Sequence, residues 1–206
     1  MRRAHMATVF GCGAVLLSYP DERSFAADME AVAEALPGLP SGGERTKLGD
    51  CCGWLSGLGA REAGAAYVEA FDLRRRRSLY LSYYRYGDTR ERGMALAALA
   101  ATYRTAGFSI VPGELPDFLP ALLELAASHP AGEALLAEHR ASLGALQEEL
   151  QKAHRHYAGV VSAVSSVLGP LDRAGRALLA RYRELGPPSE DVGLEPFTPP
   201  EVLGAR

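Results

Sequence analysis

Alanine and leucine dominate this sequence, and no other feature limits its possible folds as strongly. The 206 residues include 34 Ala and 29 Leu, against 11 Val and a single Ile. Alanine and leucine are strong helix formers, whereas strands are rich in β-branched and aromatic residues. A chain of this length can also bury about 70% of its unfolded surface without support from disulfides or metals. The composition therefore predicts an all-α fold.

Apolar residues recur at intervals of three and four along most of the chain, which is the spacing of one helix face. Proline and glycine interrupt this pattern and divide it into segments. The predicted helices are 8–18, 21–37, 44–58, 61–71, 88–107, 120–128, a long helix carrying Leu136 to Leu150, a Val-rich helix over 157–168, and a last helix over 171–185. We therefore expect an all-α, single-domain, compact helical bundle of about eight to nine helices.

The last part of the chain has a different composition. Residues 187–206 hold five Pro and four acidic residues but only one Arg. A segment this polar and Pro-rich lacks the apolar residues needed for a core of its own. We therefore divide the chain into a helical domain, residues 1–186, and a Pro-rich acidic C-terminal tail, residues 187–206.

Charge, cysteine content and hydropathy exclude several classes of protein. The net charge is −3 and the pI is about 6.0, whereas nucleic-acid-binding domains are usually basic. Cys12, Cys51 and Cys52 form no C-x-x-C pair, so neither a disulfide framework nor a zinc site is expected. No apolar run reaches the roughly 18–20 residues of a membrane span. We expect a cytoplasmic protein that does not insert into the membrane and does not bind nucleic acid.

The sequence contains no arrangement typical of catalysis or metal binding. It has no G-x-S-x-G, P-loop or G-x-G-x-x-G motif. His154 and His156 are two residues apart, so they lie on different sides of a helix rather than together on a metal. We therefore predict no catalytic residue, no metal site and no cofactor of the protein's own. An enzyme with an active site between helices is a third hypothesis, and strongly shifted titrating groups in one pocket would indicate it.

Residues 72–87 interrupt the helical pattern and are expected to be irregular. Four consecutive arginines, 74–77, are followed by four tyrosines: Tyr80, Tyr83, Tyr84 and Tyr86. Either a solvated loop or an anionic partner explains the arginines, and either packing between helices or a binding surface explains the tyrosines. A helical regulatory or RNA-associated protein is the alternative function, since it would use the same residues to contact phosphates and stack bases.

Residues 114–120, Glu-Leu-Pro-Asp-Phe-Leu-Pro, are the second unusual stretch. In the structural interpretation they begin a helix, with Asp117 in a first turn where the helix dipole favours an acidic side chain. In the functional interpretation they form the acidic rim of a hydrophobic groove, on the wall opposite the Arg- and Tyr-rich stretch.

Three central motifs, residues 67–73, 78–84 and 87–93, resemble a known family, and residues 16–22, 103–108 and 193–197 continue the likeness. Glu114-Leu115-Pro116-Asp117 is similar to an E-x-P-D-H motif. Together these motifs resemble the NarJ family, the assembly chaperones or "delta subunit" of membrane-bound nitrate reductase, within the TorD/DmsD/NarJ group. The resemblance covers nearly the whole chain.

The resemblance implies an all-helical cytoplasmic chaperone that is not an enzyme and not part of the final enzyme. Such a chaperone binds the N-terminal segment of the catalytic subunit of respiratory nitrate reductase and holds that subunit until the molybdenum cofactor is inserted. Three positions depart from the family pattern. Phe118 replaces a His, and Ala70 and Ser82 stand where Thr is expected. Because Phe118 has no titratable donor, no role of that His is carried over.

We therefore predict that an amphipathic client peptide lies in a groove, with its apolar face on apolar side chains and its basic or N-terminal end near acidic ones. The predicted client-binding residues are Tyr67, Glu69, Phe71, Leu79, Tyr83, Asp88, Glu114, Pro116, Asp117 and Phe118. The predicted partner is the N-terminal peptide of the nitrate reductase catalytic subunit. The chaperone itself is expected to be a monomer or a weak homodimer.

The tail is predicted to compete with this client. Residues 72–92 carry seven Arg against three acidic residues, a net charge of +4, and residues 187–206 carry four acidic residues against one Arg, a net charge of −3. Opposite charges favour a fold-back of the tail near the groove, with Leu194 and Phe197 as apolar anchors.

Overall fold

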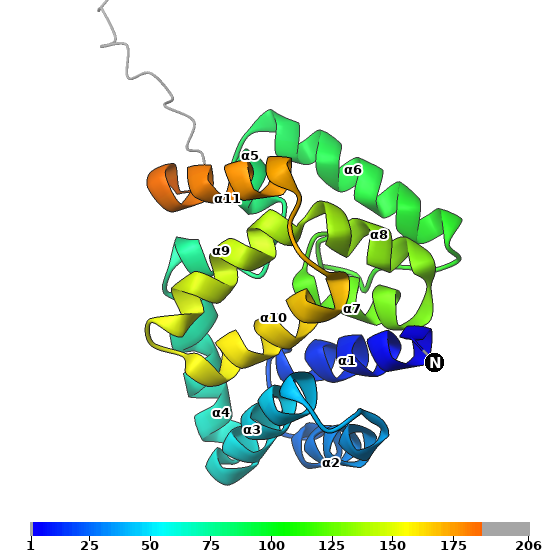
Figure 1. The fold of residues 1–206 in the computed structure, drawn as a ribbon, viewed down its shortest axis with the longest axis vertical. Coiled ribbons are helices and arrows are strands. Elements are labelled where there is room, and N and C mark those ends of the chain that lie inside the picture. Colours follow the sequence, from blue (N-terminus) through cyan, green and yellow to red (C-terminus); the bar gives the residue numbers. More distant parts are fainter. Residues whose placement is uncertain (1, 187–206) are drawn as a thin grey trace, which may run out of the picture.

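The computed structural model describes residues 2–186, so the predicted tail lies outside the described residues. Within that range the chain folds into eleven α-helices, and the all-α fold predicted from composition is confirmed (Figure 1). The helices are α1 (Arg2–Leu16), α2 (Phe25–Ala35), α3 (Gly43–Leu58), α4 (Ala60–Tyr67), α5 (Tyr83–Tyr86), α6 (Arg90–Thr105), α7 (Leu119–Ser128), α8 (Pro130–Glu138), α9 (Arg140–Gln151), α10 (Arg155–Leu168) and α11 (Arg173–Leu185).

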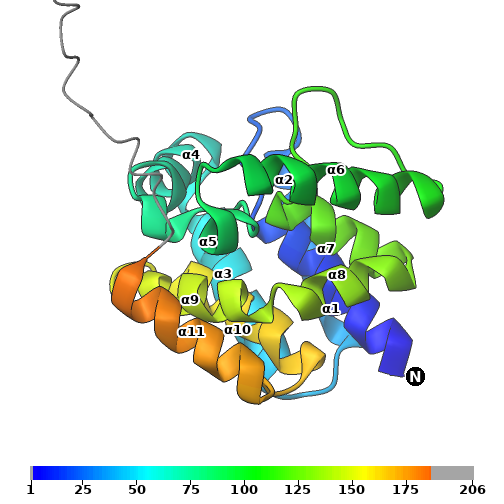
Figure 2. The same ribbon diagram turned by 90° about the horizontal axis from the view of Figure 1, so that it is seen from above.

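Helix α1 runs through the middle of the core, where it packs against α7 and α10 (Figures 1 and 2). Gly13 makes this approach possible. A Cβ atom at Gly13 would lie 3.1 Å from Val164 Cγ2 and 3.4 Å from Leu123 Cδ1. Helix α10 packs in turn against α3 and α9, and α11 covers α9. Ala and Leu fill one hydrophobic cluster to which these helices all contribute.

The long helix predicted after Pro130 is two helices, α8 and α9. They meet at His139, whose backbone φ of −95° and ψ of 14° lie outside the helical region. Nδ1 of this residue lies 2.9 Å from the Leu135 carbonyl oxygen, which also accepts the His139 amide. No Pro or Gly marks this break. The apolar spacing continues through the break because both helices bury the same side. The break and the short α5 raise the number of helices in the described range above the eight or nine expected.

The predicted irregularity of residues 72–87 is largely confirmed. Helix α4 ends in a π-helical turn, Val68–Asp72, which is followed by a 3₁₀ turn, Arg75–Arg77, and only then by the four residues of α5. Tyr84 holds this segment in place. Its ring is buried, and its hydroxyl donates to the carbonyl oxygens of Arg76 and Ser78, both at 3.0 Å.

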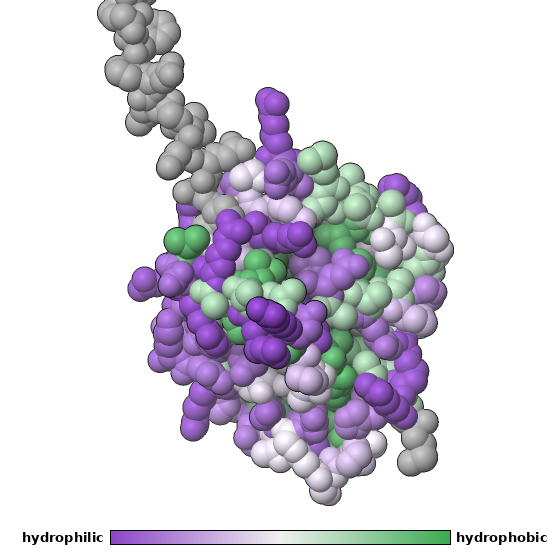
Figure 3. All heavy atoms as spheres, turned by 45° about the horizontal axis from the view of Figure 1, so that its top comes forward, coloured by the Kyte–Doolittle hydropathy of each residue, from purple (hydrophilic) through white to green (hydrophobic). Residues whose placement is uncertain are grey.

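Helix α6 lies at the edge of the molecule (Figure 2). Of its side chains, only those of Leu99 and Tyr103 are buried, whereas α10 buries six residues. Figure 3 shows apolar side chains gathered toward the upper right, over the position of α6 in Figure 1, while hydrophilic side chains cover most of the remaining face.

Candidate functional site

The two unusual sequence stretches meet in the folded chain. Tyr80 and Phe118 form an isolated antiparallel bridge. The Leu81 amide donates to the Asp117 carbonyl oxygen and the Leu119 amide donates to the Leu79 carbonyl oxygen, both at 2.9 Å. Residues 114–120 and the Arg- and Tyr-rich stretch therefore lie side by side, joined by backbone hydrogen bonds.

A cleft of about 560 Å³ opens where these stretches join the end of α4. Seven of the ten predicted client-binding residues line it: Tyr67, Phe71, Leu79, Tyr83, Asp88, Glu114 and Phe118. The other lining residues are Tyr19, Asp72, Arg74, Arg75, Ser78, Tyr80 and Arg92. We call this hollow the aromatic cleft.

The floor of the aromatic cleft is part of the hydrophobic core. Tyr67, Phe71 and Leu79 are buried. The Phe71 ring lies 4.9 Å from the Tyr67 ring and 4.8 Å from that of Tyr157 on α10, measured between centroids. Because a core helix supports it from below, the floor is a preformed apolar surface that needs little rearrangement to receive a ligand.

Phe118 takes its place in this apolar surface. Its ring lies 5.4 Å from the Tyr80 ring, with the planes inclined by 37°. A His at this position would add a polar, titratable group to the cleft, whereas Phe118 extends the contact area. The departure from the family motif therefore makes this cleft more hydrophobic.

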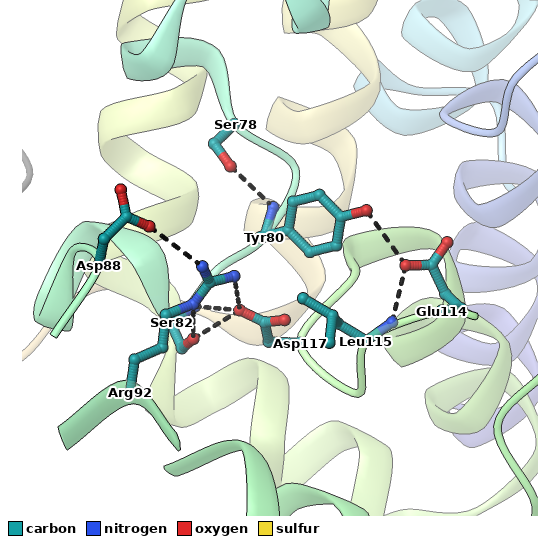
Figure 4. A network of polar contacts seen from close by, with 8 residues as sticks. All are labelled: Ser78, Tyr80, Ser82, Asp88, Arg92, Glu114, Leu115 and Asp117. Carbon is teal, nitrogen blue, oxygen red and sulfur yellow. Dashed lines mark hydrogen bonds and ion pairs between the residues drawn. The ribbon is translucent and has the colours of Figure 1, made fainter. Parts of the chain in front are cut away.

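Arg92, in the first turns of α6, connects the cleft to a buried acid (Figure 4). Its Nη2 lies 3.3 Å from Asp117 Oδ2 and its Nη1 lies 3.6 Å from Asp88 Oδ1. Its Nε donates to Ser82 Oγ at 3.3 Å. The guanidinium carbon also lies over two rings, 5.8 Å from the Tyr80 centroid and 5.6 Å from the Tyr83 centroid. One side chain thus joins both walls of the cleft.

Asp117 lies beneath the cleft rather than on the acidic rim where the sequence predicted it. Its side chain is fully buried, and Oδ2 accepts hydrogen bonds from the Ser82 hydroxyl at 2.5 Å and from the Ser82 amide at 3.2 Å. With Arg92 these contacts all engage Oδ2, while Oδ1 is buried without a hydrogen-bond partner among the described residues. Ser82 keeps the hydroxyl that the expected Thr would supply, so this departure from the family pattern preserves the contact. The pairing makes Asp117 a structural support of the cleft.

Two further predicted residues do not line the cleft. Glu69 is exposed on the π-helical turn, where its carbonyl oxygen accepts a hydrogen bond from Arg77 Nη1 at 3.3 Å. Pro116 is buried within the 114–120 segment.

Glu114 and Tyr80 form a polar contact inside the cleft. The Tyr80 hydroxyl donates to Glu114 Oε1 at 3.2 Å, and the same oxygen accepts the Leu115 amide at 2.8 Å (Figure 4). Burial, followed by the charge of Glu114, raises the pKa of Tyr80 to about 12. Tyr80 is therefore a hydrogen-bond donor at neutral pH, and its bond with Glu114 engages only one of the two carboxylate oxygens.

Sequence reasoning missed Tyr19 and Arg92. Tyr19 is 59% exposed and its ring meets that of Tyr67 edge-on at 5.4 Å. Arg92 had a sequence signal, since Asp88 and Arg92 are four residues apart near a helix start, a spacing that favours an ion pair. Nothing in the sequence pairs either residue with a partner far along the chain.

The described chain has a second hollow away from the aromatic cleft. A larger cavity of about 1040 Å³ runs along α11; we call it the α11 groove, and its lining includes Tyr86, Glu138, Arg140, Leu178, Tyr182 and Gly186. None of the ten predicted residues lines it.

The remaining features concern metals, thiols and membranes. Among residues 2–186 no group of His, Cys, Asp or Glu is placed to hold a metal, and the three cysteines are free and buried. The helices in the same range are all too short or too polar to cross a bilayer.

Comparison with known proteins finds relatives whose names all refer to nitrate reductase. The model of a family described as nitrate reductase delta subunit matches residues 27–163. The nitrate reductase-like protein NarX of Mycobacterium tuberculosis is 40% identical over 158 residues, which cover 76% of this chain and 24% of that protein. The nitrate reductase molybdenum cofactor assembly chaperone NarJ of Escherichia coli is 35% identical over 148 residues, or 69% of this chain and 62% of that protein.

A third relative aligns over most of its own length. The probable nitrate reductase molybdenum cofactor assembly chaperone NarJ of Bacillus subtilis is 29% identical over 163 residues, or 77% of this chain and 87% of that protein. The chain thus spans about a quarter of NarX and less than two thirds of the Escherichia coli relative.

Proposed function

The chain belongs to the nitrate reductase delta subunit family, and from that premise we propose that it is an assembly chaperone for a nitrate reductase rather than an enzyme. Two of its relatives carry the name of molybdenum cofactor assembly chaperone. The proposed client is the catalytic subunit of the reductase. The chaperone holds this subunit while the molybdenum cofactor is inserted and then releases it in the cytoplasm.

The proposed contact is between the N-terminal segment of the client and the aromatic cleft. Tyr67, Phe71, Leu79 and Phe118 form the apolar surface, and Tyr83 adds a half-buried ring at its edge. Asp88 and Glu114 supply negative charge for a basic residue or the α-amino group of the client. A peptide that presents apolar residues on one helix face and a positive group at one end fits this arrangement.

The observation that carries this proposal is the pairing of a preformed apolar floor with acidic groups inside one cleft. A client that orders on binding loses roughly 2–5 kcal/mol of the gross interaction energy. Because the floor is preformed, the chaperone loses little further free energy in ordering its own site. The loss on the client side keeps binding moderate and reversible. Reversible binding suits a protein that must release its client after assembly.

Asp117, Pro116 and Glu69 have supporting roles in this proposal. Asp117 and Arg92 join the 114–120 segment to the start of α6, which fixes the distance between the two walls. Pro116 is buried in the same segment. Glu69 belongs to the π-helical turn from which Phe71 reaches the cleft floor, and such turns are common at functional sites.

The RNA-binding alternative is less well supported. Base stacking needs exposed ring faces. Tyr80 has Phe118 at 5.4 Å and the Arg92 guanidinium at 5.8 Å, and Tyr84 is fully buried. Two of the four tyrosines in this stretch are therefore occupied by the protein itself.

Titration calorimetry with the N-terminal peptide of the cognate nitrate reductase catalytic subunit tests the proposal. We expect saturable binding by the wild-type chain. Tyr83→Ala removes a ring at the edge of the cleft, and truncation of such an anchor should weaken binding by about tenfold or more. Tyr86→Ala is the matched control, because Tyr86 is also half-buried in α5 but lines the α11 groove.

Equal loss of affinity in Tyr83→Ala and Tyr86→Ala would place the client elsewhere. No binding to a chain whose circular dichroism shows it folded would reject the N-terminal segment as the client element. A gel shift with single-stranded RNA that weakens steeply with salt would instead favour the alternative function.

A further inference from the structure

Three exposed arginines form a basic strip beside the aromatic cleft. Arg74, Arg75 and Arg76 are exposed, and none has an acidic partner within 4.0 Å among residues 2–186. We call them the Arg strip. Three unpaired positive charges on adjacent residues repel one another and attract an anionic segment.

The Arg strip connects the aromatic cleft with the end of α11. Arg74 and Arg75 line the cleft. The Arg76 guanidinium lies against Gly186, where a Cβ atom would be 3.1 Å from Arg76 Nη2. Gly186 has a φ of +71°, and its amide donates to the Tyr182 carbonyl oxygen as the cap of α11. The chain therefore leaves its last described helix directly beside the strip.

The segment that follows has the charge and the length to cover this path. Residues 187–206 have a net charge of −3, with four acidic residues and one Arg, against three positive charges on the strip. An extended chain spans about 3.3 Å per residue, so the segment after Gly186 can extend by as much as about 66 Å. Leu194 and Phe197 follow the first two acidic residues, Glu190 and Asp191, and offer apolar side chains for the cleft floor.

We propose that residues 187–206 bind the Arg strip in the same molecule and place Leu194 and Phe197 in the aromatic cleft, where they compete with the client. This inference rests on the proposed function, since it regulates the same site. The acidic residues bind first to the arginines, and the apolar residues then cover the floor that a client peptide would use. Binding of a client displaces the segment, so the empty cleft is never left exposed to other apolar chains.

The α11 groove is the other surface within reach, since Gly186 lines it as well. Its charged lining consists of Arg85, Arg140 and Arg181 against Glu91, Glu138 and Asp172. These charges balance, and so do those that line the aromatic cleft, Arg74, Arg75 and Arg92 against Asp72, Asp88 and Glu114. The difference is Arg76, which lies against Gly186 and belongs to neither lining, so its positive charge is added on the side of the cleft. Two of the three acidic residues of the cleft already have partners, Asp88 in Arg92 and Glu114 in Tyr80, and the third, Asp72, lies two residues before the strip.

Photo-crosslinking in the full chain tests the contact without any client. A benzophenone amino acid is placed at Phe197, the sample is irradiated at low protein concentration, and the linked peptide is identified by mass spectrometry. We expect links within residues 67–83 of the same molecule. The proposal would be overturned by links to α8, α9 or α11, by links only between molecules, or by the absence of any link.

Charge reversal tests the role of the Arg strip. Arg74→Glu with Arg75→Glu should lower the yield of the link about fivefold, the change expected when two exposed ion pairs are lost. The matched control is Arg61→Glu with Arg173→Glu, which changes the net charge equally at two exposed residues outside the cleft. Raising the salt concentration should also lower the yield. Equal yields in both double variants would overturn the proposal.

Adding the client peptide separates this inference from the proposed function. If both hold, the peptide lowers the yield of the link at residues 67–83 as it saturates the cleft. Client binding in the calorimeter with an unchanged yield would overturn the competition. A link at residues 67–83 together with no client binding would support the tail contact and reject the proposed function.

Discussion

Two acidic residues from one stretch of the sequence differ in burial and in their partners. Asp117 and Glu114 lie three residues apart in one acidic stretch, yet Asp117 is fully buried while Glu114 lines the cleft. The difference comes from their partners. Asp117 Oδ2 meets Ser82 and Arg92 inside the protein, whereas Glu114 meets a neutral Tyr80 hydroxyl. The first residue joins buried segments beneath the cleft, and the second is part of the cleft lining.

Removing the buried carboxylate is expected to destabilise the protein strongly. In Asp117→Ala, Arg92 loses its buried partner while its own side chain is only 16% exposed. We expect a loss of about 3 kcal/mol in the free energy of unfolding. Urea denaturation followed by circular dichroism measures it. Adding Arg92→Leu should recover part of the loss, because the unpaired charge is then removed as well.

Asp50→Ala serves as the control for this measurement. Asp50 is an exposed acid on α3 without an ion pair in the described part of the chain. Its replacement should change the free energy of unfolding by less than about 0.5 kcal/mol. If Asp117→Ala changes stability as little as this control, the Asp117–Arg92 pair does not support the cleft.

At the scale of the elements, neighbouring residues in the sequence determine where a helix begins, and close packing between helices determines where it lies. Pro130 begins α8, and His129 Nδ1 caps it by accepting the Ala131 amide at 3.1 Å. Gly132 then lies so close to the end of α7 that a Cβ atom would overlap the Ala126 backbone and lie 2.6 Å from the Leu125 carbonyl carbon. The corner between α7 and α8 therefore depends on a glycine inside a helix.

Gly132→Ala should accordingly be costly. The added methyl group meets backbone atoms that cannot move aside, so we expect a loss of about 3 kcal/mol in the free energy of unfolding or a failure to fold. Gly93→Ala is the matched control, because Gly93 lies in α6 with no atom within 4 Å of the new methyl group. It should gain about 0.5–1 kcal/mol from the better helix propensity of alanine. A stable Gly132→Ala variant would contradict the close approach of α7 and α8.

At the scale of the whole molecule, tyrosines from different elements share one buried environment. Burial is the main cause that raises the pKa of Tyr67, Tyr84, Tyr103 and Tyr157 above the usual value, and Tyr80 titrates at about 12. In the folded protein these hydroxyls keep their protons above pH 10, where the unfolded chain loses them. The resulting stabilisation is complete below about pH 10 and is lost as the pH rises toward the folded-state pKa values.

Alkaline unfolding should therefore be cooperative. The urea concentration at the midpoint of unfolding is expected to fall steadily above about pH 10, with helical circular dichroism and phenolate absorbance changing together. Tyr103→Phe tests the cause, because the buried Tyr103 hydroxyl has no hydrogen-bond partner among the described residues. This variant should match the wild type at neutral pH and lose less stability in alkali. An unchanged alkaline response would mean that Tyr103 does not take part.

The abundance of Ala and Leu and the helical spacing of apolar residues were enough to predict the all-α fold, because helix formation depends on residues three and four apart. The same spacing marks residues 72–87 and 114–120 as unusual, since both stretches interrupt it. The break at His139 escaped it because the apolar spacing continues across the break.

Only the tertiary structure decided which of these side chains meet. Ser82 and Asp117 are 35 positions apart and Arg76 and Gly186 are 110 apart, and each pair depends on how α1, α7 and α10 pack in the core. Packing of this kind depends on the shapes of many side chains at once, and no local pattern records it. The sequence therefore determined that helices form, and the packed core determined which residues form a cleft and which lie beneath it.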